Sequence, residues 1–386
     1  MMTTPHDINR RRELFPTLQA GSYLLSHSLG PVPTTAVDSM RAYLDEWQGH
    51  ASEDAWSKRW WELSTTIGDL FANLIGASAG TVQVQPNASL ALQSVLSCFD
   101  FSKPGKNKVV TTSLDFPSMG YVWEAQCGLG ANVCIVKSDD DIHLDTQRIL
   151  EAIDHQTVLV ALSHVSYRSS HRVDERAIIR RAHEVDAHVL LDAYQSIGVL
   201  AIDAADWDVD FMVGGSIKWL CGGPSCGYLY VRPDLIPKLK PRLTGWIAHR
   251  NPFDFSHDAM VYDSSVRRFA QGTPSIPALY SVKPGLEIIN QVGVDAIARE
   301  SRRRTQRIVD FANERGWRLH SPHDVDRRGG SVMIEVGRPF ERVKALAKDG
   351  VFVDARPGVG LRVSPHFFNT DDEIEQALET IAHHLT

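Results

Sequence analysis

The 386-residue sequence predicts an α/β protein with a large domain on a mostly parallel seven-stranded sheet and a smaller C-terminal α/β domain. Short apolar runs rich in β-branched residues alternate with segments of helix length. This is the pattern of parallel strands joined by helical crossovers. The chain is also longer than the ~250–300 residues at which one hydrophobic core stops growing, so we expect two domains.

The large domain is expected to span residues 31–275 and to follow an extended N-terminal arm, residues 1–30. A helix is expected at 36–47, before the sheet begins. Apolar strand patterns bounded by turn residues then recur along the domain. The predicted strands cover residues 81–84, 108–112, 132–136, 158–163, 188–191, 211–214 and 227–231.

The small domain is expected to span residues 276–386. It begins with a long helical pattern at 278–292 that continues through 294–313 and connects the two domains. The remaining strands are expected at 331–336, 351–355 and 360–363, with helices at 340–348 and 370–383.

The composition narrows the classes of partner. A net charge of −7 and a pI near 6.1 argue against nucleic acid, because phosphate binding requires clustered positive charge. No apolar stretch approaches the ~20 residues of a membrane span, and residues 1–12 lack the apolar core of a signal peptide. The 5 cysteines are scattered and lack metal-site spacing. We therefore expect a cytoplasmic protein with reduced thiols and no metal site.

Lys218 is the most informative single residue. It is the one lysine in the glycine-rich, otherwise uncharged run 214–224. Desolvation among apolar neighbours lowers the pKa of a lysine, and a neutral amine can attack an aldehyde. The run therefore predicts a lysine that forms a covalent bond to a carbonyl group.

Asp192 supplies the expected partner of Lys218. It ends the apolar strand 188–191, at the sheet edge where open α/β folds bind ligands, and Lys218 follows the next strand, 211–214. Pyridoxal phosphate requires such a pair, because the amine bonds to its aldehyde and the carboxylate keeps its ring nitrogen protonated. The alternative is a half-buried structural ion pair, which also shifts pKa values.

A series of motifs runs through most of the chain in a consistent order: residues 23–30, 75–77 with 82–89, 115–118, 163–168, 245–246, 272–274 and 361–365. Together they resemble the class V, fold-type I family of pyridoxal-phosphate enzymes, and within it the chain is most similar to kynureninase. The resemblance implies the fold-type I architecture, with strand 227–231 as an antiparallel edge. It also implies a homodimer with shared active sites.

Ala88 and Ser89 are assigned to the cofactor phosphate. They follow strand 82–84 and precede a helix expected to begin near Leu90, and a helix N-terminus favours anions. Without the family match, a plain helix cap is an equal alternative. Phe116 matches the aromatic residue that stacks on the cofactor ring; taken alone, it would be a core residue.

Further cofactor contacts follow from the resemblance. Gln195 lies three positions after Asp192 and should lie over the cofactor, within hydrogen-bonding reach of its phenolic oxygen or of the substrate. Trp246 and Thr273 match residues that reach the phosphate across the dimer interface.

Arg362 matches the family's arginine that binds the substrate carboxylate, and its planar fork of donors suits that group. A surface arginine on a strand is the alternative. Ser28 and His50 align loosely with positions near the substrate. His50 is also consistent with an ordinary loop histidine.

Three positions depart from kynureninase. Gln195 replaces a histidine, Ile217 replaces the tyrosine before the lysine, and Met119 replaces the acid of the Phe-Pro motif. These changes remove three polar functions, so the sequence leaves kynurenine as substrate in question.

The sequence therefore favours a kynureninase-like enzyme that cleaves the Cβ–Cγ bond of a β-acyl amino acid and releases alanine. The alternative is a class V aminotransferase, or a related epimerase or lyase, acting on a small amino acid. A cysteine desulfurase is disfavoured because no cysteine follows Cys226, and a nicotinamide enzyme because no Gly-x-Gly-x-x-Gly follows the first strand. Intact Lys218, Asp192 and Arg362 argue against a purely regulatory protein.

Overall fold

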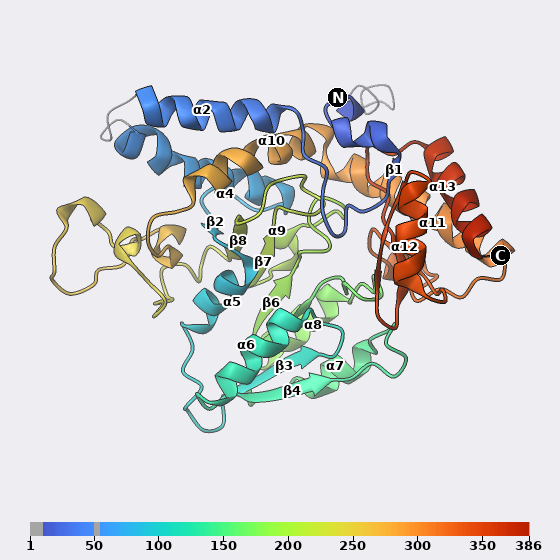
Figure 1. Cartoon of the computed structure of the whole chain (residues 1–386). Helices are drawn as coiled ribbons and strands as arrows, with labels where there is room; N and C mark the ends of the chain where they lie inside the picture. Colours follow the sequence, from blue (N-terminus) through green and yellow to red (C-terminus); the bar gives the residue numbers. More distant parts are fainter. Residues whose placement is uncertain (1–10, 50–54, 386) are drawn as a thin grey trace.

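The computed structural model describes residues 11–49 and 55–385, and Figure 1 shows its central sheet covered by helices. The sheet has seven strands in the order β2-β8-β7-β6-β5-β3-β4. This confirms the predicted fold class. The strands are β2 (Val82–Gln85), β3 (Lys108–Thr112), β4 (Asn132–Val136), β5 (Thr157–Ser163), β6 (His188–Asp192), β7 (Phe211–Gly215) and β8 (Gly227–Val231).

The position of β8 differs from the prediction. It is antiparallel to its neighbours, as expected, but it lies inside the sheet between β2 and β7, so its assignment as an edge strand was wrong. All five residues of β8 are buried. A buried strand needs hydrogen-bond partners on both sides, and β2 provides the second set. The strands β7, β6, β5, β3 and β4 are mutually parallel.

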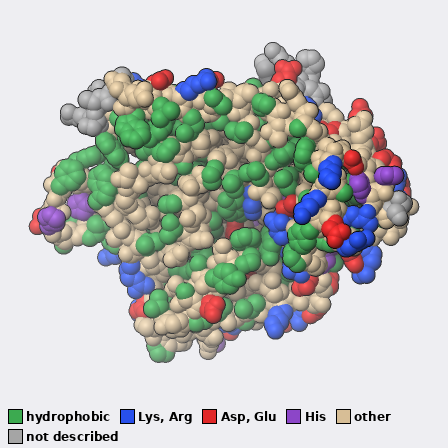
Figure 2. Space-filling model, viewed as in Figure 1, with side chains coloured by type: hydrophobic (Ala, Val, Ile, Leu, Met, Phe, Trp, Pro, Cys, Tyr) green, Lys and Arg blue, Asp and Glu red, His purple; other side chains and the backbone are tan. Residues whose placement is uncertain are grey.

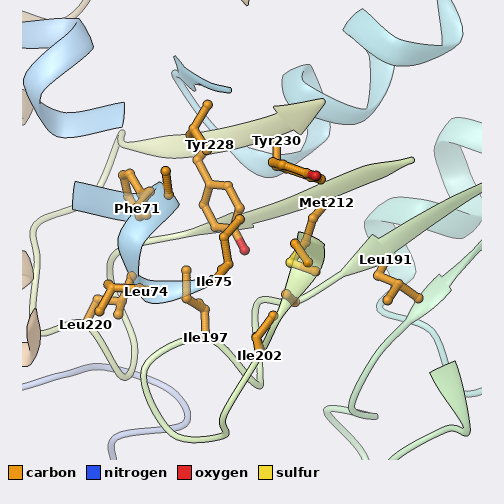
Figure 3. Packing of buried hydrophobic residues seen from close by; sticks show 14 of the residues in the cluster. Phe71, Leu74, Ile75, Leu191, Ile197, Ile202, Met212, Leu220, Tyr228 and Tyr230 are labelled. Atoms are coloured by element: carbon orange, nitrogen blue, oxygen red, sulfur yellow. The ribbon is translucent and has the colours of Figure 1, made fainter. Parts of the chain in front are cut away.

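Both faces of the sheet are covered. Leu190 and Leu191 are consecutive residues of β6, both fully buried, and they belong to two different core clusters. This alternation places one core on each face. Figure 3 shows one of these cores, where the ring of Phe71 stacks on Tyr228 of β8 with centroids 4.8 Å apart. The covering helices include α4 (Trp61–Leu74), α5 (Ala88–Leu96), α6 (Pro117–Cys127), α7 (Thr146–Ala152), α8 (Glu175–Glu184) and α9 (Ala204–Trp207).

The long helical segments lie along one side of the sheet. Helix α2 (Thr35–Gly49) packs against α10 (Ile276–Val292), as Figure 1 shows. Gly293 separates α10 from α11 (Val294–Glu314), so the predicted continuous pattern is two helices. None of the helices in the described part of the chain is both long and apolar enough to cross a bilayer.

The C-terminal region forms a three-stranded antiparallel sheet with two helices. Its strands are ordered β11-β12-β9, with bounds Asp354–Arg356, Gly360–Val363 and Val332–Ile334. Helices α12 (Pro339–Lys348) and α13 (Asp371–Leu385) pack beside it. The strand predicted at 351–355 is divided between β10 (Val351–Phe352) and β11.

The N-terminal arm packs on this C-terminal region. Strand β1 (Ser22–Tyr23) pairs in parallel with β10, and Asn369 donates a hydrogen bond to the Tyr23 carbonyl. The Gly30 N–H donates to the Ile217 carbonyl in the loop after β7, so the arm contacts both the C-terminal region and the large sheet region. The remaining short helical segments are Pro16–Ala20, Ala55–Trp60, Trp246–Ala248, Pro252–Asp254, Val266–Phe269 and Val325–Arg327.

Candidate active site

Lys218 lies in the loop that follows β7, against the N-terminal arm. The Gly30 N–H donates to the Ile217 carbonyl at 2.7 Å. A Cβ atom on Gly30 would lie 2.1 Å from the Lys218 carbonyl oxygen, so glycine alone allows this close approach. Burial lowers the pKa of Lys218 to about 8, and neighbouring Asp192 only partly opposes this. About one Lys218 side chain in eleven is therefore a neutral amine at pH 7, far more than for a solvated lysine.

Asp192 is the last residue of β6, next to β7 in the sheet. Its Oδ1 accepts a hydrogen bond from the Tyr194 N–H at 2.9 Å. Burial raises the pKa of Asp192 to about 6, while this hydrogen bond and the charge of Lys218 act in the opposite direction. Asp192 is thus a buried carboxylate that is still ionised at pH 7. Because burial disfavours an unpaired charge, a cationic group next to Asp192 would be stabilised.

Most of the predicted cofactor-binding residues line one cavity of about 230 Å³. Its walls come from the ends of parallel strands and from the start of α5, as expected for a ligand site in an open α/β sheet. The predicted residues that line it are Ala88, Ser89, Phe116, Asp192, Gln195 and Lys218. Residues separated by more than a hundred positions in the sequence therefore meet at one site.

The start of α5 forms one end of the cavity. Asn87 is the helix cap, and its Oδ1 accepts from the Leu90 N–H at 2.9 Å. The capping role therefore belongs to Asn87, while Ala88 and Ser89 form the first helical turn, two residues earlier than predicted. A Cβ on Gly227 would lie 3.0 Å from the Ala88 nitrogen. Glycine at this position therefore leaves space beside the first turn of α5, and we call this space the phosphate cradle. This end is suited to a phosphate.

Phe116 is not a core residue, since 44% of it is exposed. Its ring meets the Tyr167 ring edge-on with centroids 5.0 Å apart, and Lys218 Nζ lies 5.7 Å from its centroid. Lys218 Nζ also lies 4.3 Å from the centre of the Tyr194 ring. Aromatic faces therefore border the amine, in a geometry that suits a flat heterocycle.

Gln195 has both ends of its amide engaged. Its Nε2 donates to the His27 carbonyl at 3.1 Å, and its Oε1 accepts from Trp219 Nε1 at 3.2 Å. One N–H of the amide remains for the cavity that Gln195 lines. Met119 also lines the cavity and is buried. The cavity wall is therefore apolar at the position where kynureninase has the acid of its Phe-Pro motif.

Arg362 is a buried residue of β12 rather than a surface arginine, with 2% of its side chain exposed. Nε donates to Asp354 Oδ1 at 2.7 Å, Nη2 donates to Asp354 Oδ2 at 2.5 Å, and Nη1 donates to the Tyr167 carbonyl at 3.0 Å. The sequence analysis did not identify Asp354, His27 or Tyr167 as neighbours of Arg362. Among the described residues that line the Lys218 cavity, Tyr167 is present and Arg362 is not, so Arg362 lies behind the wall to which Tyr167 belongs. Pro357 and Gly358 mark a turn between two short strands, which is a signal that Asp354 and Arg362 face each other.

The other predicted residues lie elsewhere or outside the described ranges. Trp246 and Thr273 do not line the Lys218 cavity of their own chain, as far as the described residues show. Thr273 lines a neighbouring cavity of about 280 Å³ together with Trp61, whose ring is 6.1 Å from that of Trp246. Ser28 is half-buried in the arm, near Gly30. His50 lies outside the described residues.

The described residues fit pyridoxal phosphate. Gly227 leaves the phosphate cradle open, Lys218 offers a poorly solvated amine, and Asp192 offers a buried carboxylate. A fold of this kind with such a site defines a pyridoxal-phosphate enzyme of fold-type I.

Comparison with known proteins identifies the family. Residues 22–376 match the class-V aminotransferase family. An uncharacterised aminotransferase of Bacillus subtilis, YcbU, is 32% identical over 373 residues, covering 96% of each chain. Kynureninase of Bacillus anthracis is 29% identical over 372 residues, covering 92% of this chain and 86% of the kynureninase. The chain therefore belongs to the class-V aminotransferase family, and pyridoxal phosphate is its cofactor.

Solved structures share the fold at lower identity. The cysteine desulfurase of Thermococcus onnurineus NA1 superposes with a TM-score of 0.87 at 21% identity, covering 100% of this chain and 99% of the other. A C-DES mutant with glycine covalently linked to its pyridoxal-phosphate cofactor gives a TM-score of 0.86 at 18% identity, covering 96% and 98%.

Proposed function

We propose that this enzyme acts on an α-amino acid with a β-acyl side chain, hydrolyses its Cβ–Cγ bond as a kynureninase does, and releases alanine. The observation that carries the proposal is that Lys218, Asp192 and Tyr167 line one cavity. The Tyr167 carbonyl accepts a hydrogen bond from Arg362. The similarity to a kynureninase over 92% of this chain supports the reaction type.

When bound, pyridoxal phosphate supplies an aldehyde for amines and a protonated ring that takes up the electron pair left at Cα. Lys218 Nζ, with its pKa lowered to about 8 by burial, takes the α-proton from the substrate and returns it. Asp192 is ionised at neutral pH and holds a proton at the ring nitrogen. The first-turn amides of Ala88 and Ser89 bind the phosphate.

Arg362 binds the substrate carboxylate and thereby orients Cα toward Lys218. The side chain of the substrate would then lie near Phe116, Met119 and Tyr167, which line the cavity. Two of these are apolar and the third carries a phenol that can donate to a carbonyl oxygen. An aromatic acyl group suits such a surface.

Transamination is the second candidate. YcbU is named an aminotransferase and is slightly more similar to this chain than the kynureninase is. Met119 and Ile217 also place apolar side chains where kynureninase has polar groups, which weakens the case for hydrating a ketone. An aminotransferase would instead release a keto acid and pass the amino group to a keto acceptor.

One assay separates the two candidates. The purified holoenzyme is incubated with L-kynurenine or β-benzoyl-L-alanine, with and without 2-oxoglutarate, and alanine and keto acids are quantified together. We expect alanine without any keto acceptor, and none with the Lys218→Ala variant. Turnover that requires 2-oxoglutarate and yields a keto acid assigns the enzyme as an aminotransferase.

We also propose a homodimer with shared active sites. Figure 2 shows hydrophobic side chains gathered over the outer end of α2 and the loop at residues 246–263, while charged side chains gather over the C-terminal region. In that loop Trp246 is 37% exposed and Phe255 is 71% exposed, and Trp47 of α2 is 62% exposed. A patch of this kind supports an interface that brings Trp246 and Thr273 to the partner's phosphate. A monomeric mass by light scattering would contradict it.

The free state of the five cysteines supports a cytoplasmic location, which cell fractionation can test.

A further inference from the structure

The Asp354 carboxylate lies between two guanidinium groups and an imidazole. It accepts both Nε–H and Nη2–H of Arg362, lies 3.0 Å from Arg356 Nη1, and lies 2.7 Å from His27 Nε2. Arg362 and His27 are almost fully buried, and the Asp354 side chain is 18% exposed. These partners hold the pKa of Asp354 well below its usual range, although burial alone would raise it. Asp354 is therefore a permanent carboxylate beside Arg362.

His27 connects this carboxylate to the large domain. Asp354 can only accept, so Nε2 of His27 carries the proton, and Nδ1 accepts from Ser364 Oγ at 2.5 Å. Burial and the charge of Arg362 lower the pKa of His27 to about 4, so it is neutral at physiological pH. Its carbonyl accepts from Gln195, which lines the Lys218 cavity. His27 thus lies between the cavity wall and the small sheet, which is the three-stranded sheet β11-β12-β9.

Within the described ranges, the hydrogen bonds of Arg362 leave two of its N–H groups without a partner. A guanidinium has five N–H groups, and Asp354 and Tyr167 engage three of them. Asp354 holds the edge formed by Nε and Nη2, so Nη1 and Nη2 each keep one N–H, and these two form the terminal edge if the Tyr167 carbonyl takes the outer N–H of Nη1. Two parallel N–H groups are what a carboxylate needs for bidentate binding. With Arg356 also present, positive charge remains in excess of the single Asp354 charge.

We propose that Asp354, held in place by His27, is a positioning residue that orients the terminal edge of Arg362 toward the α-carboxylate of the substrate. This inference rests on the proposed role of Arg362. Asp354 does not compete with the substrate, because it uses a different edge of the guanidinium. It also links recognition of the substrate carboxylate to the placement of the N-terminal arm, which supplies His27.

The test compares two probes that differ by one carboxylate, L-alanine and ethylamine. Their dissociation constants for the holoenzyme are measured from the change in cofactor absorption, in the wild type, Asp354→Asn, Arg362→Gln and the double variant. Asparagine keeps the shape of Asp354 but turns an N–H toward Arg362 Nη2, which breaks one arm of the fork. For Asp354→Asn we expect alanine binding to weaken roughly tenfold or more, the size of one lost charge-assisted hydrogen bond, with ethylamine binding unchanged.

The control is Asp349→Asn, which removes an exposed ion pair with His384 in the same region and should alter neither constant. The double variant should bind alanine no more weakly than Arg362→Gln alone. If Asp354→Asn does not retain the cofactor, His27→Gln replaces it, with alanine binding weakened at least threefold and ethylamine binding unchanged.

The outcomes separate the two claims. If Arg362→Gln still prefers alanine to ethylamine, or if the wild type has no such preference, the proposed role of Arg362 is wrong. If Arg362→Gln loses the preference but the Asp354 or His27 variant keeps it, only the positioning role is wrong. Tighter alanine binding in Asp354→Asn would mean that Asp354 occupies the place of the substrate, which also overturns the inference.

Discussion

The rate at which the apoprotein bonds to pyridoxal phosphate should report the environment of Lys218 directly. Burial lowers the pKa of Lys218 from 10.5 to about 8. At pH 7 about one molecule in eleven then carries the neutral amine, against about one in three thousand for an ordinary lysine, a ratio of about 300. Since only the neutral amine attacks the aldehyde, Lys218 should gain this factor over a solvated lysine.

The assay is stopped-flow mixing of apoprotein with pyridoxal phosphate between pH 6 and pH 10, followed by absorption. The same reaction with N-acetyl-lysine serves as the reference, because dividing the two rates cancels the ionisation of the cofactor. We expect the ratio to be constant below pH 8 and to fall about tenfold per pH unit above it, because only the free lysine continues to deprotonate.

Borohydride reduction and peptide mapping should place the label on Lys218, and Lys218→Ala should remove it. A ratio that stays constant to pH 10 would show that the amine is solvated and ordinary. That result would refute the argument from burial, even if the label is on Lys218.

Asp192→Asn should retain the cofactor but lower kcat/KM about a hundredfold or more, because the amide cannot hold the ring proton; near wild-type turnover would exclude that role. Gly227→Ala places a Cβ 2.7 Å from the Asn87 carbonyl carbon and should weaken cofactor binding about tenfold by equilibrium titration, whereas Gly120→Ala, with no atom within 4 Å, should not. Equal effects of the two alanines would contradict the cradle. Phe71→Ala should lower the free energy of unfolding by about 3–5 kcal/mol in urea, and exposed Tyr121→Ala by less than about 0.5 kcal/mol. Similar losses would contradict the core packing.

The strands were the most predictable part of the fold. Their apolar runs and bounding turns are local features, and each predicted strand of the large sheet lies within a residue or two of an observed one. The pairing of β8 was less predictable, because it depends on β2, a strand more than a hundred positions away. The family analogy correctly indicated the antiparallel direction but misplaced the strand at the edge.

The meeting of Ala88, Asp192 and Lys218 at one cavity was predictable for a related reason. Asp192 is the last residue of β6, and Ala88 and Lys218 come three residues after the ends of β2 and β7. Parallel strands bring their carboxyl ends to the same edge of the sheet. Local patterns combined with this topological rule were enough to place them together, and the structure adds the burial that shifts the pKa values of Asp192 and Lys218.

The sequence by itself determined the fold class, the family and the residues at the strand ends, because these depend on short-range periodicity and motif order. The tertiary structure alone decided what surrounds Arg362. His27 and Asp354 are 327 positions apart and come from the arm and the small sheet, so no local pattern relates them. Their contact depends on β1 pairing with β10 and on β11 folding back on β12, and such long-range packing is set by the whole chain rather than by any segment of it.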